Sequence, residues 1–193
     1  MPPRLADLLL AQMQARSHVA PKRLTTPGPS LEELNLIFSA AAQAPDHGRI
    51  RPWRFITVPQ NKRCELGHAF AQALLTRDPK ASKIEVNDAH QKALRAPFLM
   101  LAVLNNKPSS PAIPTHERLV SLGCAIQNML LMAQALSMGS AITSGKGVVS
   151  HSIRTLFQLN PDEEAICFIN FGKIESIKPQ RLRADFSNFI SSI

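Results

Sequence analysis

The chain has 193 residues, of which 45% are hydrophobic, so it can bury one full core and is not a disordered composition. Its formal net charge of +8 favours an anionic partner: a phosphate-bearing ligand, nucleic acid or an acidic membrane surface. The absence of Tyr and the single Trp argue against a single-strand nucleic-acid surface, which needs exposed stacking rings.

The three cysteines are Cys64, Cys124 and Cys167, an odd number at wide spacing. None belongs to a CxxC pair or to the Cys/His spacing of a zinc site, so we expect no metal site. Each lies in an apolar neighbourhood. We therefore expect three reduced, buried thiols and a cytoplasmic location.

Two apolar segments raise the question of membrane targeting. The first 17 residues do not resemble a signal peptide, because Asp7, Gln12 and Gln14 interrupt the apolar run. Residues 119–145 carry no charge and are long enough to span a bilayer, but they contain many polar side chains that lipid would leave unpaired. A buried helix followed by a buried strand is the better interpretation.

The spacing of apolar residues, together with capping residues and chain breakers, predicts the elements in chain order. Ser30 and Glu33 form the pattern of a capping box at the start of the second helix, which Pro45 should end near Ala44. The expected helices span residues 5–15, 30–44, 61–76, 81–94, 116–137 and 149–158. The expected strands span residues 53–58, 96–104, 139–143 and 165–172.

The helix at 116–137 is apolar nearly all round and needs cover on every side, part of which a second subunit could provide. We expect a single α+β domain over residues 1–193, an α/β sandwich with a mixed central sheet and a long buried central helix. The tail, residues 172–193, has weak periodicity and ends apolar. It is either disordered or packed against another surface, which could be the partner subunit.

Three short patterns have both a functional and an ordinary interpretation. "SGKG" at 144–147 lacks the spacing and the hydroxyl of a Walker A loop. Its backbone N–H groups and Lys146 would suit a phosphate, but taken alone it is better explained as an ordinary strand-to-helix turn. Arg16 and Ser17 offer a phosphate grip, or simply a cation at a helix end. His47, beside Asp46, is a site residue or a solvated loop residue. No Gly-x-Gly-x-x-Gly is present, so a Rossmann nicotinamide site is not supported.

Taken together, these patterns resemble one family. "AQAPDHGRIRPWRF" at 42–55 resembles the signature of the flavin-dependent nitroreductases, and most closely the small NAD(P)H nitroreductases of under 200 residues. "QARS" at 14–17 stands where the family has an R-R-S run. Residues 113–147 resemble the central helix, strand and loop, and "ICFINFGKI" at 166–174 resembles the last core strand. The resemblance covers roughly residues 5 to 180.

The resemblance implies a homodimer with FMN at the interface and NADH or NADPH as hydride donor. It further implies a ping-pong reaction, in which hydride passes through flavin N5 to a nitro compound, quinone or similar acceptor. No side chain is expected to be catalytic, because the cofactor performs the chemistry. The residues matched to FMN contacts are Arg16 and Ser17 at the phosphate and ribityl chain, Gln43 and His47 from the other subunit's loop, and Thr143, Ser144 and Gly145 at the phosphate end.

The sequence departs from the family at several of these positions. Ala15 replaces the first Arg, and Ile142 with Thr143 replaces a Trp-Arg pair. Charge-assisted hydrogen bonds contribute about 1.5–3 kcal/mol each, so two lost cations would weaken FMN binding about a hundredfold unless Lys146 or Lys173 compensates. Arg51 stands where a neutral polar residue usually precedes Pro-Trp, and His116 replaces a Trp.

Three hypotheses follow. The leading one is an FMN-dependent NAD(P)H oxidoreductase of the nitroreductase class. A weak or non-catalytic flavin or nucleotide binder with the same fold is the alternative that the lost cations suggest. A nucleic-acid-binding domain rests on the net charge of +8 alone.

Overall fold

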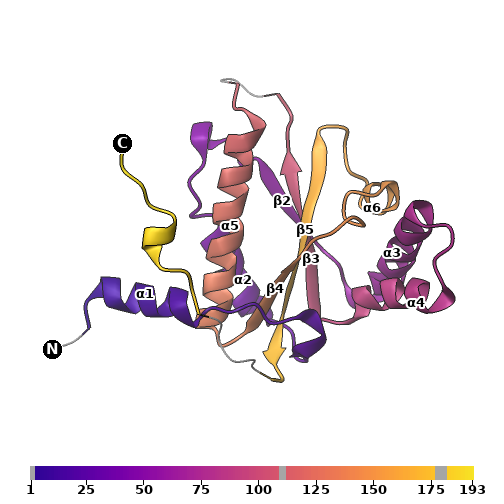
Figure 1. The fold of residues 1–193 in the computed structure, drawn as a ribbon, viewed down its shortest axis with the longest axis horizontal. Coiled ribbons are helices and arrows are strands. Elements are labelled where there is room, and N and C mark those ends of the chain that lie inside the picture. Colours follow the sequence, from indigo (N-terminus) through magenta and orange to yellow (C-terminus); the bar gives the residue numbers. More distant parts are fainter. Residues whose placement is uncertain (1–2, 109–111, 177–181) are drawn as a thin grey trace.

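The structure, a computed structural model, describes residues 3–108, 112–176 and 182–193 (Figure 1). Its helices are α1 (Leu5–Ala15), α2 (Leu31–Ala41), α3 (Arg63–Arg77), α4 (Lys83–Gln91), α5 (Thr115–Ala135) and α6 (His151–Leu156). Its strands are β1 (Leu24–Thr25), β2 (Trp53–Thr57), β3 (Phe98–Asn105), β4 (Gly139–Thr143) and β5 (Glu163–Ile174). Short 3-10 turns lie at residues 21–23, 47–49, 60–62, 92–94 and 186–188.

The sheet has the order β1-β5-β3-β2, with β4 also paired to β5. Residues 168–171 of β5 pair with β3 on one edge and with β4 on the other, so β5 lies between these two strands. The expected α+β class is confirmed, with a correction to the expected mixed sheet. The ladders of the described residues are antiparallel, and parallel pairing is limited to an isolated bridge between His18 and Ser140. The α5 crossover does make β3 and β4 parallel, but β5 separates them and runs the opposite way.

Helices cover both faces of the sheet (Figure 1). α2 and α5 lie on one face, where Ile37, Leu122 and Met129 form a core with the sheet. α3 and α6 lie on the other, where Leu66 and Ile153 do the same. Residues 99–104 of β3 are all buried, as expected for an apolar strand covered on both faces.

The capping box of α2 is confirmed. The Ser30 hydroxyl accepts from the Glu33 N–H, and the Glu33 carboxylate accepts from the Ser30 N–H at 2.7 Å. The helix ends at Ala41 rather than near Ala44, because the chain already turns over residues 42–44. The uncharged run at 119–145 becomes most of α5 and the whole of β4. No helix in the described part of the chain has the length and hydropathy of a membrane span.

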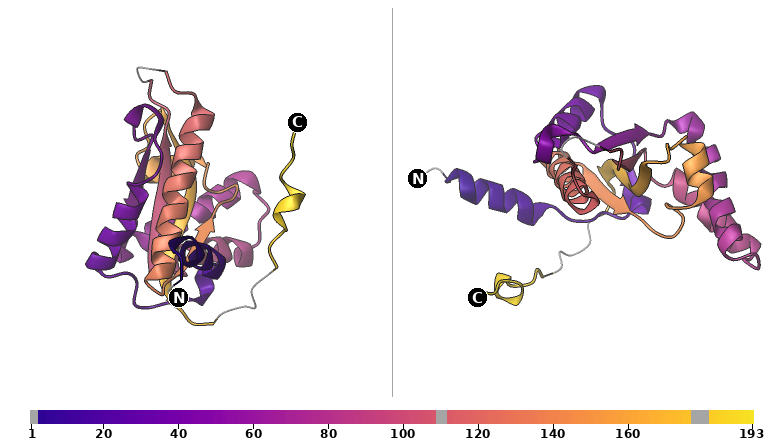
Figure 2. Two further views of the ribbon diagram at one scale, coloured as in Figure 1. Left: turned by 90° about the vertical axis from the view of Figure 1, so that its left-hand side faces the viewer. Right: turned by 90° about the horizontal axis from the view of Figure 1, so that it is seen from above.

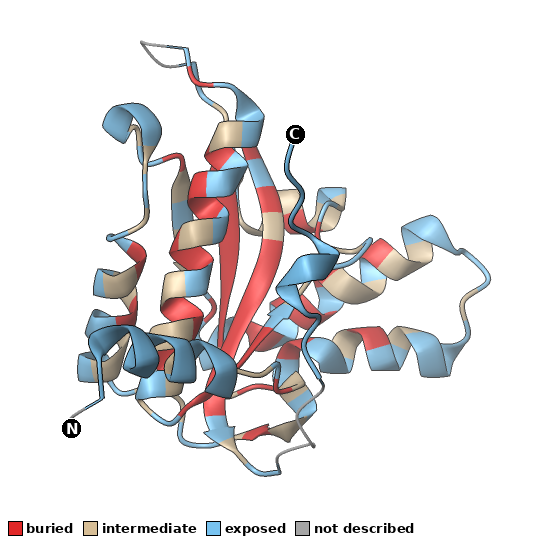
Figure 3. Cartoon of the chain, turned by 60° about the vertical axis from the view of Figure 1, so that its left-hand side comes forward, coloured by how far each residue is buried: buried red, intermediate tan, exposed pale blue. Residues whose placement is uncertain are grey.

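α1 and the segment 182–193 extend from the same side of the molecule (Figure 2). α1 has no buried residue, although five of its side chains are large and apolar (Figure 3). The 182–193 segment is exposed throughout, and its Arg183 donates a hydrogen bond to the Arg16 carbonyl. β5 continues to Ile174, so residues 172–174 belong to the sheet and not to the expected tail.

The thiols differ from one another. Cys167 is buried, and burial raises the pKa of its thiol to about 11. Cys124 is half-buried, and Cys64 is exposed. The expectation of three buried thiols is therefore wrong for Cys64, which faces outward from the first turn of α3.

Candidate functional site

Arg16 and Ser17 lie beside the start of β4. The chain leaves α1 at Arg16 in an extended conformation and forms the parallel bridge from His18 to Ser140. The Val19 N–H donates to the Ser140 carbonyl at 2.9 Å. This pairing holds both expected site residues, which are half-buried, against the edge of the sheet.

Gly139 makes this close approach possible. A Cβ at this position would lie 2.6 Å from the Leu24 Cδ2 atom and 2.8 Å from the Ile174 Cγ1 atom. Residues 19–25 therefore pack directly on the first residue of β4. A larger side chain at Gly139 would have to displace the side chains of Leu24 and Ile174, next to the segment that follows Arg16 and Ser17.

The region around Arg16 is cationic and has no acidic partner among the described residues. Burial, and secondarily the nearby Arg183, lowers the pKa of Arg16. Burial, followed by Arg16 and Arg23, lowers the pKa of His18, so this imidazole is uncharged at neutral pH. The Arg23 Nε atom is buried without a hydrogen-bond partner in the described structure. Neighbouring guanidinium groups without acidic partners suit an anion such as a phosphate group.

Thr143, Ser144 and Gly145 lie at the opposite end of β4. Ser144 and Gly145 are exposed, and a Cβ added at Gly145 would meet nothing within 4 Å, so a ligand can approach this loop closely. The Thr143 hydroxyl instead lies 3.2 Å from the Asn170 Nδ2 atom and accepts a hydrogen bond from that buried amide. Its side chain is therefore tied to the sheet.

The two groups of expected site residues beside β4 lie at opposite ends of the strand. At about 3.3 Å per residue, Gly139 and Ser144 are about 16 Å apart along the chain. Arg16 and Ser17 mark one end of this edge and the 143–145 loop marks the other. The exposed Lys146 belongs to the far end and lies apart from the guanidinium groups.

Gln43 and His47 lie in the connection between α2 and β2, and both are exposed. The His47 Nδ1 atom is 2.5 Å from an oxygen of Glu117, which belongs to the first turn of α5. The Gln43 side chain bonds back to the Ser39 carbonyl at 3.4 Å. His47 is thus oriented by a carboxylate that the sequence pattern did not identify.

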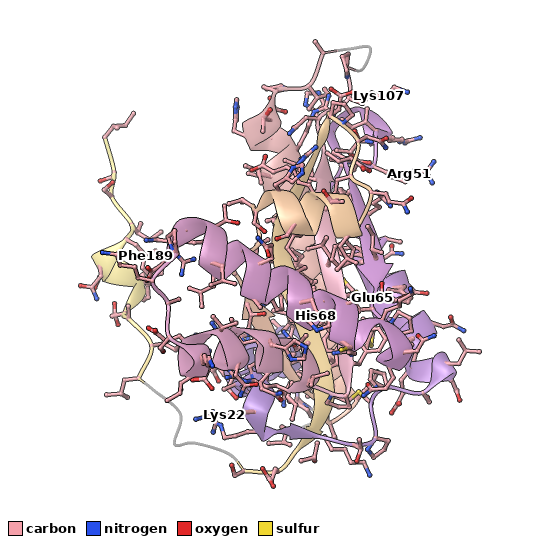
Figure 4. The ribbon with its side chains drawn as sticks, turned by 90° about the vertical axis from the view of Figure 1, so that its right-hand side faces the viewer. Lys22, Arg51, Glu65, His68, Lys107 and Phe189 are labelled. Atoms are coloured by element: carbon pink, nitrogen blue, oxygen red, sulfur yellow. The ribbon has the colours of Figure 1, made fainter. Side chains whose placement is uncertain are left out.

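The same connection is held in an unusual backbone conformation. Gly48, Arg49 and Arg51 have φ angles of 70°, 53° and 44°, in the left-handed region that non-glycine residues rarely adopt. The Asp46 carboxylate accepts a hydrogen bond from the Arg51 N–H at 2.7 Å and helps to hold this shape. The Arg51 side chain is exposed and extends outward from the ribbon (Figure 4). Such strain is often found where a loop serves a site.

One protomer does not bring His47 and Arg16 together. His47 binds Glu117 at the start of α5, whereas the Gln12 side chain of α1 bonds to the Leu131 carbonyl near its end. These positions are 14 residues apart, about 21 Å along a helix. His47 therefore lies apart from Arg16 in the protomer.

The sequence reasoning did not find Arg23, Arg183, Glu117 and Asn170. Arg183 lies 167 positions from Arg16, and Glu117 lies 70 positions from His47, so no local pattern could connect them. The surplus of positive charge was the one available signal for the arginines. It indicated an anionic partner without giving its position.

Comparisons with known proteins identify the family of the chain. The nitroreductase family profile matches residues 15–173. A Haemophilus influenzae protein named "Putative NAD(P)H nitroreductase" is 32% identical over 151 residues, which make up 78% of this chain and 81% of that protein. The Escherichia coli K12 protein "Putative NAD(P)H nitroreductase YdjA" is 28% identical over 152 residues, 78% of this chain and 80% of its own.

Solved structures share the fold at lower identity. A nitroreductase-like family protein from Bacillus cereus has a TM-score of 0.81 and 16% identity, and the match covers 100% of this chain and 98% of that one. A Bacteroides fragilis nitroreductase, solved with bound FMN, has a TM-score of 0.72 and 19% identity, with 96% and 98% covered. The extent of the family match, together with a relative above 30% identity, shows that the chain belongs to the nitroreductase family.

Proposed function

We propose that this protein is an FMN-dependent oxidoreductase of the nitroreductase class. With FMN bound, the cofactor would relay hydride from NADH or NADPH through its N5 atom to a nitro compound, quinone or similar acceptor, in a ping-pong sequence. The observation that carries the proposal is the cluster of Arg16, Arg23 and Arg183, which has no acidic partner in the described structure and lies at one end of β4. The reduced thiols expected from the sequence suit a cytoplasmic enzyme.

The residues of this chain divide between two tasks in this proposal. Arg16 and Ser17 hold the FMN phosphate, and Arg23 and Arg183 supply the cations that Ala15 and Thr143 no longer provide. Because the 143–145 loop lies about 16 Å from Gly139 along β4, we assign Thr143, Ser144 and Gly145 to the remainder of the cofactor and not to its phosphate. The exposed backbone of Ser144 and Gly145 lets the cofactor lie close to the strand end.

We further propose a homodimer in which Gln43 and His47 of one subunit complete the site of the other. The separation of His47 and Arg16 along α5 supports this arrangement. So does an uncovered stripe on α5, where Leu119 and Val120 are 41% and 65% exposed and Gly123 has open space beside it. The 182–193 segment, with Phe186, Phe189 and Ile190 exposed, would then pack on the partner.

The test is flavin binding followed by turnover. The purified chain should carry a flavin absorption spectrum, or acquire one with added FMN, and should then oxidise NADH or NADPH when a quinone is present. Arg16→Ala should weaken FMN binding at least tenfold, since a charge-assisted contact contributes about 1.5–3 kcal/mol. Arg77→Ala, at the exposed end of α3, is the matched control and should bind FMN normally. The proposal is refuted if the purified protein is colourless and leaves the absorption and fluorescence of added FMN unchanged.

A second candidate is a flavin binder without turnover. Thr143 stands where the family has an Arg, so this position supplies no cation. Its hydroxyl accepts a hydrogen bond from the Asn170 amide in the sheet. This candidate predicts FMN binding without NADH or NADPH oxidation in the presence of a quinone. Measurable turnover with either donor would exclude it.

A further inference from the structure

A cluster of soft ligands lies where α3 and α4 pack together and uses none of the residues assigned to the flavin site above. Cys64 and His68 are one helical turn apart on α3, and His90 belongs to the last turn of α4. The Cys64 Sγ atom is 3.8 Å from the His90 Nε2 atom, and the rings of His68 and His90 have centroids 4.9 Å apart. One thiol and two imidazoles thus converge, with ligand atoms that all lie within 4.8 Å of one another.

Gly67 explains why His90 comes so close to α3. A Cβ at Gly67 would lie 2.7 Å from the His90 Cδ2 atom and 2.8 Å from the His90 Nε2 atom. The imidazole therefore occupies the space that any other residue would fill. This contact places His90 between Cys64 and His68 on neighbouring turns of one helix.

The start of α3 is also held rigidly. Arg63, beside Cys64, is 2% exposed, and its guanidinium donates to the carbonyls of Val58, Ala93, Ala96 and Pro97. These bonds tie the first turn of α3 to the chain on both sides of it. A ligand set carried by such a rigid element needs little rearrangement to bind an ion.

We propose that Cys64, His68 and His90 bind a zinc-class divalent cation. Thiolate sulfur and imidazole nitrogen are the ligands that Zn²⁺ prefers, at about 2.3 Å and 2.0–2.1 Å. Tetrahedral bonds of these lengths separate ligand atoms by about 3.3–3.6 Å, so side-chain rotation has to close gaps of about 1 Å. Binding replaces the Cys64 thiol proton, which passes to solvent, with a Zn–S bond.

The fourth position faces solvent, because the three residues are exposed or half-buried. An open hollow of about 510 Å³ between α3 and α4 borders it, and its walls include His68, His90, Leu75 and Val86. The neighbouring carboxylate, Glu65, is engaged with Lys62 at 2.6 Å. The bound ion therefore has three protein ligands and a water, and it cross-links α3 to α4.

The experiment uses the untagged full-length chain with its native cofactor content. Zn²⁺ should bind at one ion per chain by calorimetry, raise the midpoint of thermal unfolding, and slow alkylation of Cys64 at least tenfold, as mapped by mass spectrometry of the peptides. Mg²⁺ should do none of these. Cys64→Ser, His68→Ala and His90→Ala should each weaken Zn²⁺ binding at least about tenfold, because even outer contacts to metal ligands contribute 10–100-fold.

Gly67→Ala is the sharper variant, since it retains all three ligands but displaces the His90 ring, and it should weaken binding comparably. His151→Ala and Cys124→Ser remove a histidine and a thiol outside the cluster and should bind Zn²⁺ as the unaltered chain does. If Zn²⁺ fails to protect Cys64, or protects it equally in the His68→Ala and His90→Ala variants, the site does not exist. FMN binding is a separate measurement, so this result is independent of the flavin proposal.

Discussion

Gly139 is the residue on which the placement of the phosphate end depends. It occupies the point where residues 19–25 and the end of β5 press against the start of β4. The sequence predicted the strand at 139–143 with correct bounds, but it could not show that the first position must be glycine. That requirement comes from Leu24 and Ile174, which are 115 and 35 positions away.

Gly139→Ala should therefore lower the free energy of unfolding by about 1–3 kcal/mol, the usual cost of overpacking. It should also weaken FMN binding, because the displaced residues 19–25 follow directly on Arg16 and Ser17. Urea denaturation and flavin fluorescence titration measure the two effects. Gly147→Ala is the matched control, since its nearest described neighbours would be 3.9 Å away, an ordinary contact. Equal stability of the two variants would contradict the steric argument.

At the scale of elements, sequence periodicity predicted best those helices and strands whose bounds depend on their own residues. α1 and β4 have the predicted bounds, and the capping box of α2 forms as its sequence indicates. β1 was not predicted, because two residues carry no periodicity and pair with β5 only through tertiary contact. The cluster of Cys64, His68 and His90 was not predicted for the same reason. Its three residues become neighbours only when α3 and α4 pack together.

An ion pair joins β2 to β5 across the intervening strand β3. The Arg54 guanidinium contacts both carboxylate oxygens of Glu163, at 2.5 and 2.8 Å, and Glu163 is 6% exposed. The hydrogen bond from Arg54, supported by the Asn160 N–H, lowers the pKa of Glu163. The carboxylate therefore stabilises the fold above its ordinary pKa of 4.5, and this contribution is lost as the pH falls through the lowered value.

Arg54→Ala should lower the free energy of unfolding by about 1–3 kcal/mol near neutral pH, because it leaves a buried charge with fewer partners. The deficit should shrink as the pH falls, because Glu163, whose pKa Arg54 no longer lowers, becomes protonated in the folded variant before it does in the unaltered protein. Denaturant unfolding at several pH values measures this trend. Lys62→Ala, which removes an exposed pair with Glu65, should cost under about 1 kcal/mol. A pH-independent deficit for Arg54→Ala would exclude the ionic explanation.

At the scale of the whole molecule, α5 and α1 leave apolar residues exposed in the protomer. The sequence indicated that the long helix needs cover on every side, and α5 keeps a stripe at residues 116, 119, 120, 123 and 127 exposed in the protomer. α1 adds Leu5, Leu8, Leu9, Leu10 and Met13, each more than 40% exposed. In the homodimer proposed above, a second copy of the chain covers these residues, so the pattern within one chain predicts the apolar surface but not its partner.

Val120→Glu should leave the protomer folded, since Val120 is 65% exposed, but should prevent dimer formation by placing a charge in the proposed interface. FMN affinity should fall with it, because Gln43 and His47 would no longer reach the partner's site. Analytical ultracentrifugation and flavin titration measure both. Ile84→Glu, at a 75% exposed position on α4, should remain dimeric. A dimeric Val120→Glu protein with full FMN affinity would contradict the proposed interface.

The position of β5 has a consequence for how the chain is made. This strand is the last to leave the ribosome, yet it lies between β3 and β4 and also pairs with β1. Until residue 174 has emerged, β3, β4 and β1 expose unpaired edges, and the two helical layers have no complete sheet to pack against. A nascent chain stalled before this point is therefore an aggregation hazard, and cooperative folding has to wait until β5 has emerged.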